Sequence, residues 1–229
     1  MIQVITKYPV ALDSPDHLHP WGTIRDNTSS SAFWESIRSI RPGKLSYLDL
    51  GCAGGGLVVQ AIEEYGHSAV GLEGSDYWAK HSDDLPDSTL QRATLLTTQN
   101  KGNAGEQWKK YYNQNLFTCD ISRTFSIFES GALKQFDMIT AWEVLEHLPE
   151  ERLPILFESI LRHLSNGIFL GTISTVPDRP EGFDLHQTVR PPAWWQSLFN
   201  RYFSIAPWVT SLIPARFDND SGIFLLRKK

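Results

Sequence analysis

The chain has 229 residues, of which 41% are hydrophobic, enough for one well-filled unit, and we expect residues 1–229 to form a single α/β domain. Its 26 acidic and 21 basic residues give a net charge of -5, so there is no broad positive surface for a phosphate backbone, and a nucleic-acid substrate is disfavoured. Two cysteines, no secretory signal layout and no apolar run of membrane-spanning length predict a soluble, cytoplasmic protein.

The N-terminal residues 1–42 are predicted to form an arm and a covering helix. Residues 1 to about 28 are rich in proline, aspartate and histidine without a sustained period, which predicts an irregular segment. Either His17, His19 and Trp21 in this arm line a site, or the arm is only pinned to the surface by its aromatic; the second interpretation is favoured because the sequence gives the histidines no partner. The helix should follow a run of serines that suits capping and should end before Pro42.

A strand, a glycine turn and a helix follow in YLDLGCAGGG, residues 47–56. The apolar run ends at Leu50, and the next apolar stripe predicts a helix from Gly55 to about Tyr65. Glycines let the backbone of such a turn approach a bound group closely. The exposed N–H groups at the start of the helix favour an anionic one.

A second strand, Ser68 to Leu72, ends at Glu73, which lies 22 positions after Gly51. In nucleotide-binding βαβ units an acidic residue about 20 positions on reaches the ribose hydroxyls of the ligand. The spacing favours this role for Glu73 over a solvated acid at a strand end.

A polar stretch, residues 82–115, is longer than the usual connection in a compact α/β domain, so we interpret it as an insertion with some helix near Glu106 to Tyr112. It forms either a lid or substrate wall or a plain surface loop. A third strand, Leu116 to Cys119, should end at Asp120 and Ile121. This pair suits an adenine pocket, with a strand-end cap as the competing explanation.

The fourth strand, Phe136 to Ala141, leads into WEVLEHLPEERL. Glu143, Glu146 and His147 stand at i, i+3 and i+4, so a helical turn starting there would project all three from one face.

A helix from Glu150 to Leu164 comes next, stopped by Asn166-Gly167 as a C-terminal cap. The remaining elements are a fifth strand, a helix from near Pro192, and two closing strands that form a hairpin. We place these strands at Ile168 to Ser174, Phe203 to Val209 and Gly222 to Leu226.

Four landmarks together resemble the class I methyltransferases that use S-adenosylmethionine: LDLGCAGGG, GLEGS, CDIS and FDMITAWEVLEHL, over roughly residues 45–175. The family usually has a glycine where this chain has Ala53. The resemblance implies a Rossmann-like fold: a seven-stranded, mostly parallel sheet with an antiparallel last strand and helices on both faces.

The resemblance also implies a cofactor site for S-adenosylmethionine. The glycine turn would hold the methionine part, Glu73 the ribose, Asp120 and Ile121 the adenine, and the backbone at Ala141 and Trp142 the methionine amine. The full set is Asp49, Gly51, Cys52, Ala53, Gly55, Glu73, Gly74, Ser75, Asp120, Ile121, Ala141 and Trp142.

The EVLEH segment looks like the turn of metal-using O-methyltransferases, which take a further histidine from the loop after strand five, where this chain has His186. The likeness implies that Glu143, Glu146, His147 and His186 bind Mg²⁺, Mn²⁺ or Zn²⁺, and that His147, His186 and Glu143 are catalytic. A metal-free alternative uses His147 or His186 alone as general base. In a third, structural alternative, Glu146 and His147 only cap the helix.

We therefore expect methyl transfer from S-adenosylmethionine to an oxygen of a small molecule or a sugar. The alternatives are a catalytically inactive module that binds the cofactor and acts through a partner, and an RNA methyltransferase. The sequence carries no indication of oligomeric state.

Overall fold

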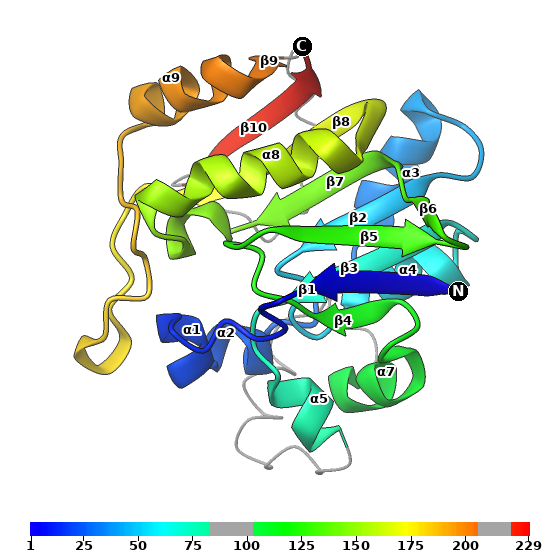
Figure 1. Cartoon of the computed structure of the whole chain (residues 1–229), viewed down its shortest axis with the longest axis horizontal. Coiled ribbons are helices and arrows are strands. Elements are labelled where there is room, and N and C mark those ends of the chain that lie inside the picture. Colours follow the sequence, from blue (N-terminus) through cyan, green and yellow to red (C-terminus); the bar gives the residue numbers. More distant parts are fainter. Residues whose placement is uncertain (83–102, 206–220) are drawn as a thin grey trace.

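A seven-stranded sheet runs through the protein in a computed structural model that describes residues 1–82, 103–205 and 221–229 (Figure 1). The strands lie in the order β4-β3-β2-β7-β8-β10-β9. Their bounds are β2 Ser46–Leu50, β3 Ser68–Glu73, β4 Leu116–Thr118, β7 Phe136–Trp142, β8 Leu164–Ser174, β9 Phe203–Ile205 and β10 Ser221–Lys228.

Neighbours from β4 to β8 pair in parallel, whereas β10 pairs antiparallel with both β8 and β9. Among the described strands of this sheet, β10 therefore runs against the other six. This confirms the predicted Rossmann-like sheet with its reversed last strand. The strand order reverses direction between β2 and β7, and in open α/β sheets the crevice at such a point holds the ligand.

Helices cover both faces of the sheet (Figure 1). On one face α8 and α9 pack over a core that also takes in the central strands, and on the other α3, α4 and α7 enclose a second cluster. The bounds are α3 Ser31–Ile40, α4 Gly56–Glu63, α7 Ala104–Tyr111, α8 Leu153–His163 and α9 Pro192–Tyr202. Short helices fill the connections: α1 Pro15–Leu18, α2 Trp21–Arg25, α5 Tyr77–His81, and the 3₁₀ turns η1 Leu145–His147, η2 Glu150–Arg152 and η3 Pro180–Gly182.

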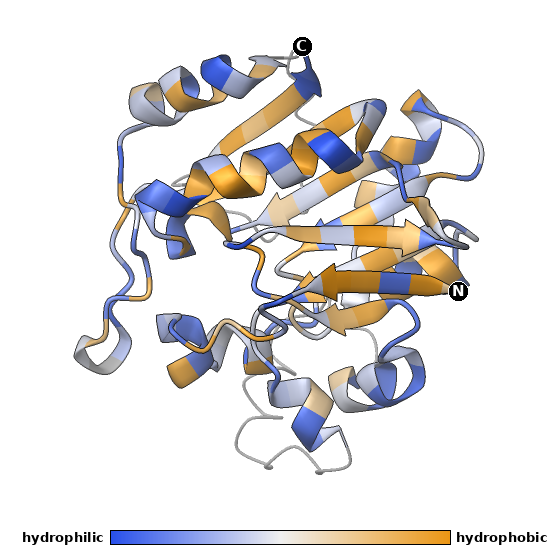
Figure 2. Cartoon of the chain, viewed as in Figure 1, coloured by the Kyte–Doolittle hydropathy of each residue, from blue (hydrophilic) through white to orange (hydrophobic). Residues whose placement is uncertain are grey.

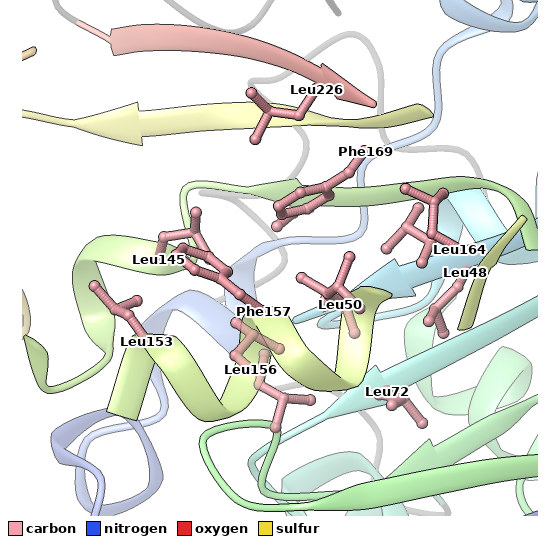
Figure 3. Packing of buried hydrophobic residues seen from close by; sticks show 14 of the residues in the cluster. Leu48, Leu50, Leu72, Leu145, Leu153, Leu156, Phe157, Leu164, Phe169 and Leu226 are labelled. Carbon is pink, nitrogen blue, oxygen red and sulfur yellow. The ribbon is translucent and has the colours of Figure 1, made fainter. Parts of the chain in front are cut away.

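The contact between α8 and the sheet shows why this sequence adopts the fold. Leu153, Leu156 and Phe157 repeat at helical spacing and are fully buried, and Figure 3 shows them with Leu50 and Phe169 of the strands. Figure 2 shows the hydrophobic colour along the central strands and along one side of α8, with polar colour on its outer side. Burying a side chain of this size stabilises the fold by about 1.5–3 kcal/mol.

The prediction of an irregular arm over residues 1–28 was wrong at two places. β1 (Ile2–Thr6) pairs antiparallel with β5 (Phe125–Glu129), and β5 pairs with β6 (Ala132–Leu133), giving a second sheet of three strands. Residues of the arm also form α1 and α2. In the strand IQVIT, alternate residues are half-buried and the others are exposed, and its partner strand lies more than 100 residues away. The local sequence pattern therefore gave no sign of the pairing.

The predicted cap at Asn166-Gly167 was also wrong. The helix α8 ends at His163, and β8 begins at once with Leu164, so both cap residues lie inside a strand. Gly167 is needed there for a different reason: a Cβ at this position would lie 1.8 Å from the carbonyl oxygen of Asp137 in the neighbouring strand.

Two predictions reach beyond the described residues. The helix expected near Glu106 to Tyr112 is present as α7, whereas residues 83–102 of the predicted insertion lie outside the described part of the chain. Residues 206–209 of the predicted strand Phe203 to Val209 also lie outside the described part of the chain. None of the helices in the described ranges has both the length and the apolar character needed to cross a membrane.

A buried histidine, His163, joins the end of α8 to the second sheet. Its Nδ1 donates to the carbonyl oxygen of Lys134 at 2.8 Å, and its Nε2 accepts from the N–H of Ile127 at 3.3 Å. Burial lowers the pKa of His163 below its ordinary value of 6.5. In the unfolded chain the ring takes up a proton at higher pH than in the folded one, so stability is lost as the pH falls below about 6.5 toward the folded pKa.

We expect His163→Gln to weaken this pH dependence, because an amide keeps a donor and an acceptor but does not titrate. The measurement is the free energy of unfolding from denaturant titrations at about pH 7.5 and about pH 5.5. The wild-type chain should lose more stability on acidification than the variant. Equal losses in the two proteins would contradict the assignment of a depressed pKa to His163.

Candidate active site

A cavity of about 1170 Å³ lies at the carboxyl edge of the parallel strands. Figure 1 shows α1, α2 and the segment with η3 beyond this edge. Cavities for a single drug-sized ligand usually measure about 300–1,000 Å³, so this one has room for more than one small molecule. The predicted site residues that line it are Gly51, Ala53, Glu73, Gly74, Ser75, Asp120, Ile121, Trp142, Glu143, His147 and His186. Those that do not line it are Asp49, Cys52, Gly55, Ala141 and Glu146.

The glycine turn after β2 adopts left-handed backbone conformations at several positions. Gly51 and Gly55 have φ angles of +70° and +84°, and a Cβ at Gly51 would lie 2.5 Å from Val144 Cγ2. Ala53 has a φ of +46°, so the residue that replaces the customary glycine still adopts the left-handed conformation. The turn places Gly55 as the N-cap of α4.

Asp49 lies under the turn and not in the large cavity. Its Oδ1 accepts a 2.6 Å hydrogen bond from Thr140 Oγ1, and Tyr47 OH is 2.7 Å from the same hydroxyl. Asp49, Gly51 and Cys52 line a separate cavity of about 20 Å³. Burial raises the pKa of the Cys52 thiol well above its ordinary value, so this thiol stays protonated and unreactive.

Glu73, at the end of β3, is buried and accepts three hydrogen bonds. Ala53 N–H donates to Oε2 at 2.8 Å, and Ser75 N–H and Thr23 Oγ1 donate to Oε1 at 2.9 and 3.2 Å. Burial raises the pKa of Glu73, and the two backbone N–H bonds oppose that shift. The acid thus joins the glycine turn to the arm.

Asp120, the acid after β4, is also buried. Its Oδ1 accepts from the N–H and the hydroxyl of Ser122, at 2.9 and 2.6 Å. This is the bond pattern of a turn cap, and it leaves the predicted adenine role of Asp120 and its neighbour Ile121 untested.

The arm forms one wall of the cavity, a feature that sequence reasoning missed. Asp16, His17, Trp21 and Thr23 all line the cavity, although the sequence favoured a surface role for His17 and Trp21. Backbone hydrogen bonds fix the arm, from Ala11 N to Gly74 O and from Gly54 N to Asp26 O, at 2.9 and 2.8 Å. The partners lie far apart in the sequence, so spacing gave no signal for this wall.

The EVLEH segment brings together only part of the predicted acid and histidine set. Glu143 has a φ of +52°, and the 3₁₀ turn η1 starts after it, so no continuous helical turn carries all three residues. Ligand atoms of Glu146, His147 and His186 lie within 4.8 Å of one another, and Glu143 is not in that group. Glu146 Oε1 accepts from Ser174 N, whereas its buried Oε2 has no hydrogen-bond partner among the described residues.

Both histidines of this group are oriented through Nδ1. His147 Nδ1 lies 2.9 Å from Asp16 Oδ2, and His186 Nδ1 lies 2.6 Å from the carbonyl oxygen of Val176. A carbonyl only accepts, so His186 carries its proton on Nδ1 and presents a free lone pair at Nε2. The two rings meet edge to face, with centroids 4.7 Å apart.

The charges of this group are coupled. Burial raises the pKa of Glu146 to about 8. Burial alone would lower the pKa of His147, but its hydrogen bond to Asp16 and the negative charges of Asp16 and Glu146 raise it to about 9. Burial lowers the pKa of His186. A buried carboxyl with a raised pKa beside two imidazoles marks the part of the cavity lined by His147 and His186 as a candidate reaction centre.

Comparisons with known proteins agree with this geometry. A family model described as "Methyltransferase domain" matches residues 25–210. The solved structure of the PH0226 protein from Pyrococcus horikoshii OT3 is 16% identical, with coverage of 98% of this chain and 97% of that one and a TM-score of 0.54. The glycopeptide N-methyltransferase MtfA, solved with (S)-adenosyl-L-methionine, is 14% identical, with coverage of 87% and 93% and a TM-score of 0.50. At these identities the two structures establish a shared fold. No curated protein sequence matches the chain.

Proposed function

Since the chain belongs to the methyltransferase-domain family, as an S-adenosylmethionine-dependent methyltransferase, we propose that it methylates an oxygen of a small molecule or a sugar with the help of a divalent metal ion. The observation that carries this proposal is one cavity lined both by the glycine turn with Glu73 and by His147 and His186, with the buried Glu146 beside the two histidines. Its volume allows cofactor and acceptor to lie side by side.

The cofactor is proposed to lie between the glycine turn and the ends of β3 and β4. Gly51 and Ala53 would meet its methionine part, Glu73 its ribose hydroxyls, and Asp120 with Ile121 its adenine. Support comes from the placement of all five on the wall of the cavity, at the strand ends next to the reversal in strand order. Asp49, Cys52 and Gly55 would act indirectly by shaping the turn, since none of them lines the cavity.

A metal ion suits the cluster on the chemistry of its donors. Glu146 offers a buried oxygen that lacks a hydrogen-bond partner within the described chain, and each histidine has its Nδ1 engaged elsewhere, which leaves Nε2 as ligand atom. Mixed oxygen and imidazole donors suit Mn²⁺ or Zn²⁺ better than Mg²⁺. An ion held there would lower the pKa of the acceptor hydroxyl. Glu143 lies outside this donor set and would face the acceptor.

The chain's own residues would perform the rest of the reaction by positioning. The acceptor hydroxyl would give its proton to water in the cavity, and its oxygen would form the new C–O bond while the C–S bond of the sulfonium breaks, which leaves S-adenosylhomocysteine. Alignment of the attacking oxygen with the methyl group supplies much of the rate. The arm and the loop that carries His186 wall off the cavity and would limit the access of water.

A metal-free route is the second candidate. In it His186 is the general base, supported by its Nδ1 bond to Val176, which leaves Nε2 able to accept the proton of the acceptor. An RNA acceptor is the third candidate, and the net charge of -5 argues against it. The cytoplasmic location likewise stays a prediction.

The test is a methyl-transfer assay on a panel of hydroxyl, sugar, amine and RNA acceptors, run with a chelator and then with Mg²⁺, Mn²⁺ or Zn²⁺ restored. We expect binding of S-adenosylmethionine by calorimetry under every condition. Turnover with hydroxyl acceptors is expected only when an ion is present. Full turnover in excess chelator would reject the metal and favour His186 as base, and turnover confined to amines or RNA would reject oxygen as the acceptor atom.

A further inference from the structure

We infer that Asp16, on the N-terminal arm, is a positioning residue that fixes His147 for metal binding, an inference that rests on the proposed function. The arm would then supply part of the reaction centre as well as a wall of the cavity. Asp16 precedes the fold's main sheet in the chain and lies 131 positions from His147. Nothing in the EVLEH motif points to it.

The contact itself is direct. Asp16 Oδ2 lies 2.9 Å from His147 Nδ1, and both side chains are about three-quarters buried. A carboxylate in this place accepts a hydrogen bond from Nδ1–H, which orients the ring and leaves Nε2 to act as the ligand atom once an ion displaces its proton. His186 is oriented in the same way by the carbonyl of Val176. Each imidazole of the cluster therefore has its own orienting group, and the arm provides one of the two.

Asp16 is held in place by contacts on both sides. Ser14 caps α1 by accepting from the N–H of Asp16 at 3.3 Å. Asp13, three residues earlier, forms ion pairs with Arg152 at 2.7 Å and with Arg123 at 3.3 Å. The segment that carries Asp16 is thus anchored through Asp13 to the turn η2 and to the loop after β4.

Substitutions at Asp13 and Asp16 can test the docking of the arm and the orientation of His147 separately. Asp13→Asn removes an anchor of the arm and leaves Asp16 intact, so it is the matched control. Asp16→Ala removes the orienting group, and Asp16→Asn keeps an acceptor oxygen without the charge. All three substitutions lie on the same short stretch of chain.

The experiment measures the dissociation constant of Mn²⁺ by calorimetry for the full chain without cofactor, and the dissociation constant of S-adenosylmethionine for the same proteins. Asp16→Ala is expected to weaken Mn²⁺ binding by about 10–100-fold, and Asp16→Asn by less. Asp13→Asn should change it by about twofold or less, because a solvent-exposed ion pair contributes little. Cofactor affinity should stay unchanged in all three, which shows that the arm and the glycine turn remain folded.

Three outcomes would overturn the inference. Equal Mn²⁺ affinity in Asp16→Ala and the wild-type chain would show that His147 needs no orienting group. Equal losses in Asp13→Asn and Asp16→Ala would assign the effect to docking of the arm as a whole. If the wild-type chain itself binds no Mn²⁺ while it still binds S-adenosylmethionine and transfers methyl groups, the proposed metal site fails, and this inference fails with it.

Discussion

Glu146→Gln is expected to lower the turnover number with a hydroxyl acceptor by roughly 10²–10³-fold, the equivalent of the several kcal/mol that a bound metal ion contributes. Glutamine keeps the acceptor for the N–H of Ser174, so the local fold is retained. It removes the group that can lose a proton and serve as an anionic ligand beside His147 and His186. The measurement is the initial rate at saturating S-adenosylmethionine with and without added Mn²⁺.

Two isosteric variants make this result specific. Glu151 lines the same cavity outside the cluster, so Glu151→Gln controls for the loss of one negative charge. Glu143→Gln tests whether Glu143 is a fourth ligand, as the resemblance implies, beside the three residues that the structure groups. We expect it to lower the turnover number less than Glu146→Gln does. A loss in Glu143→Gln as large as in Glu146→Gln would restore the four-residue set. Unchanged turnover in Glu146→Gln would remove the metal from the mechanism.

Gly171→Ala is expected to destabilise the fold by about 3 kcal/mol. A Cβ at this position would lie 1.8 Å from the carbonyl oxygen of Ala141 and 2.9 Å from Phe224 Cζ. Gly171 and Ala141 are paired in the register of β8 and β7, so the methyl group would force two central strands apart. The measurement is the free energy of unfolding by denaturant titration.

The matched control is Gly222→Ala in the adjoining strand β10. A Cβ there meets nothing nearer than 3.6 Å, from the carbonyl oxygen of Ile173. The change in stability should stay within about 0.5 kcal/mol. Similar decreases in the free energy of unfolding in the two variants would mean that the destabilisation comes from strand flexibility and not from the close approach of β7 and β8.

The main sheet could be predicted because its signals are local. Each parallel strand is an apolar run, and the acids after two of them, Glu73 and Asp120, both line the cavity at the edge of the sheet. The second sheet could not be predicted, because β1 and β5 pair across more than 100 residues of sequence. The predicted cap at Gly167 was wrong for a related reason. A glycine after a helix often serves as its C-terminal cap, whereas this glycine lies in β8, where the close approach of β7 leaves no room for a side chain.

Part of the candidate site could also be predicted from local sequence motifs, and part of it could not. Glu146 and His147 are neighbours in the sequence, and the resemblance added His186, so the cluster was within reach of a motif argument. Glu143 was expected in it on helical spacing, but its left-handed backbone comes before the turn that carries Glu146. Asp16 had no motif and no spacing to connect it with His147, because only the folded arm brings the two together.

The ladder between β1 and β5 also sets an order of events during synthesis of the chain. Among the described residues the strand partner of residues 2–6 is 125–129, so the ladder cannot form until more than 100 further residues have been made. Contacts of such sequence separation are slow to form. The segment that walls the cavity follows directly after β1, so the end of this wall next to β1 becomes fixed only once residues 125–129 are present.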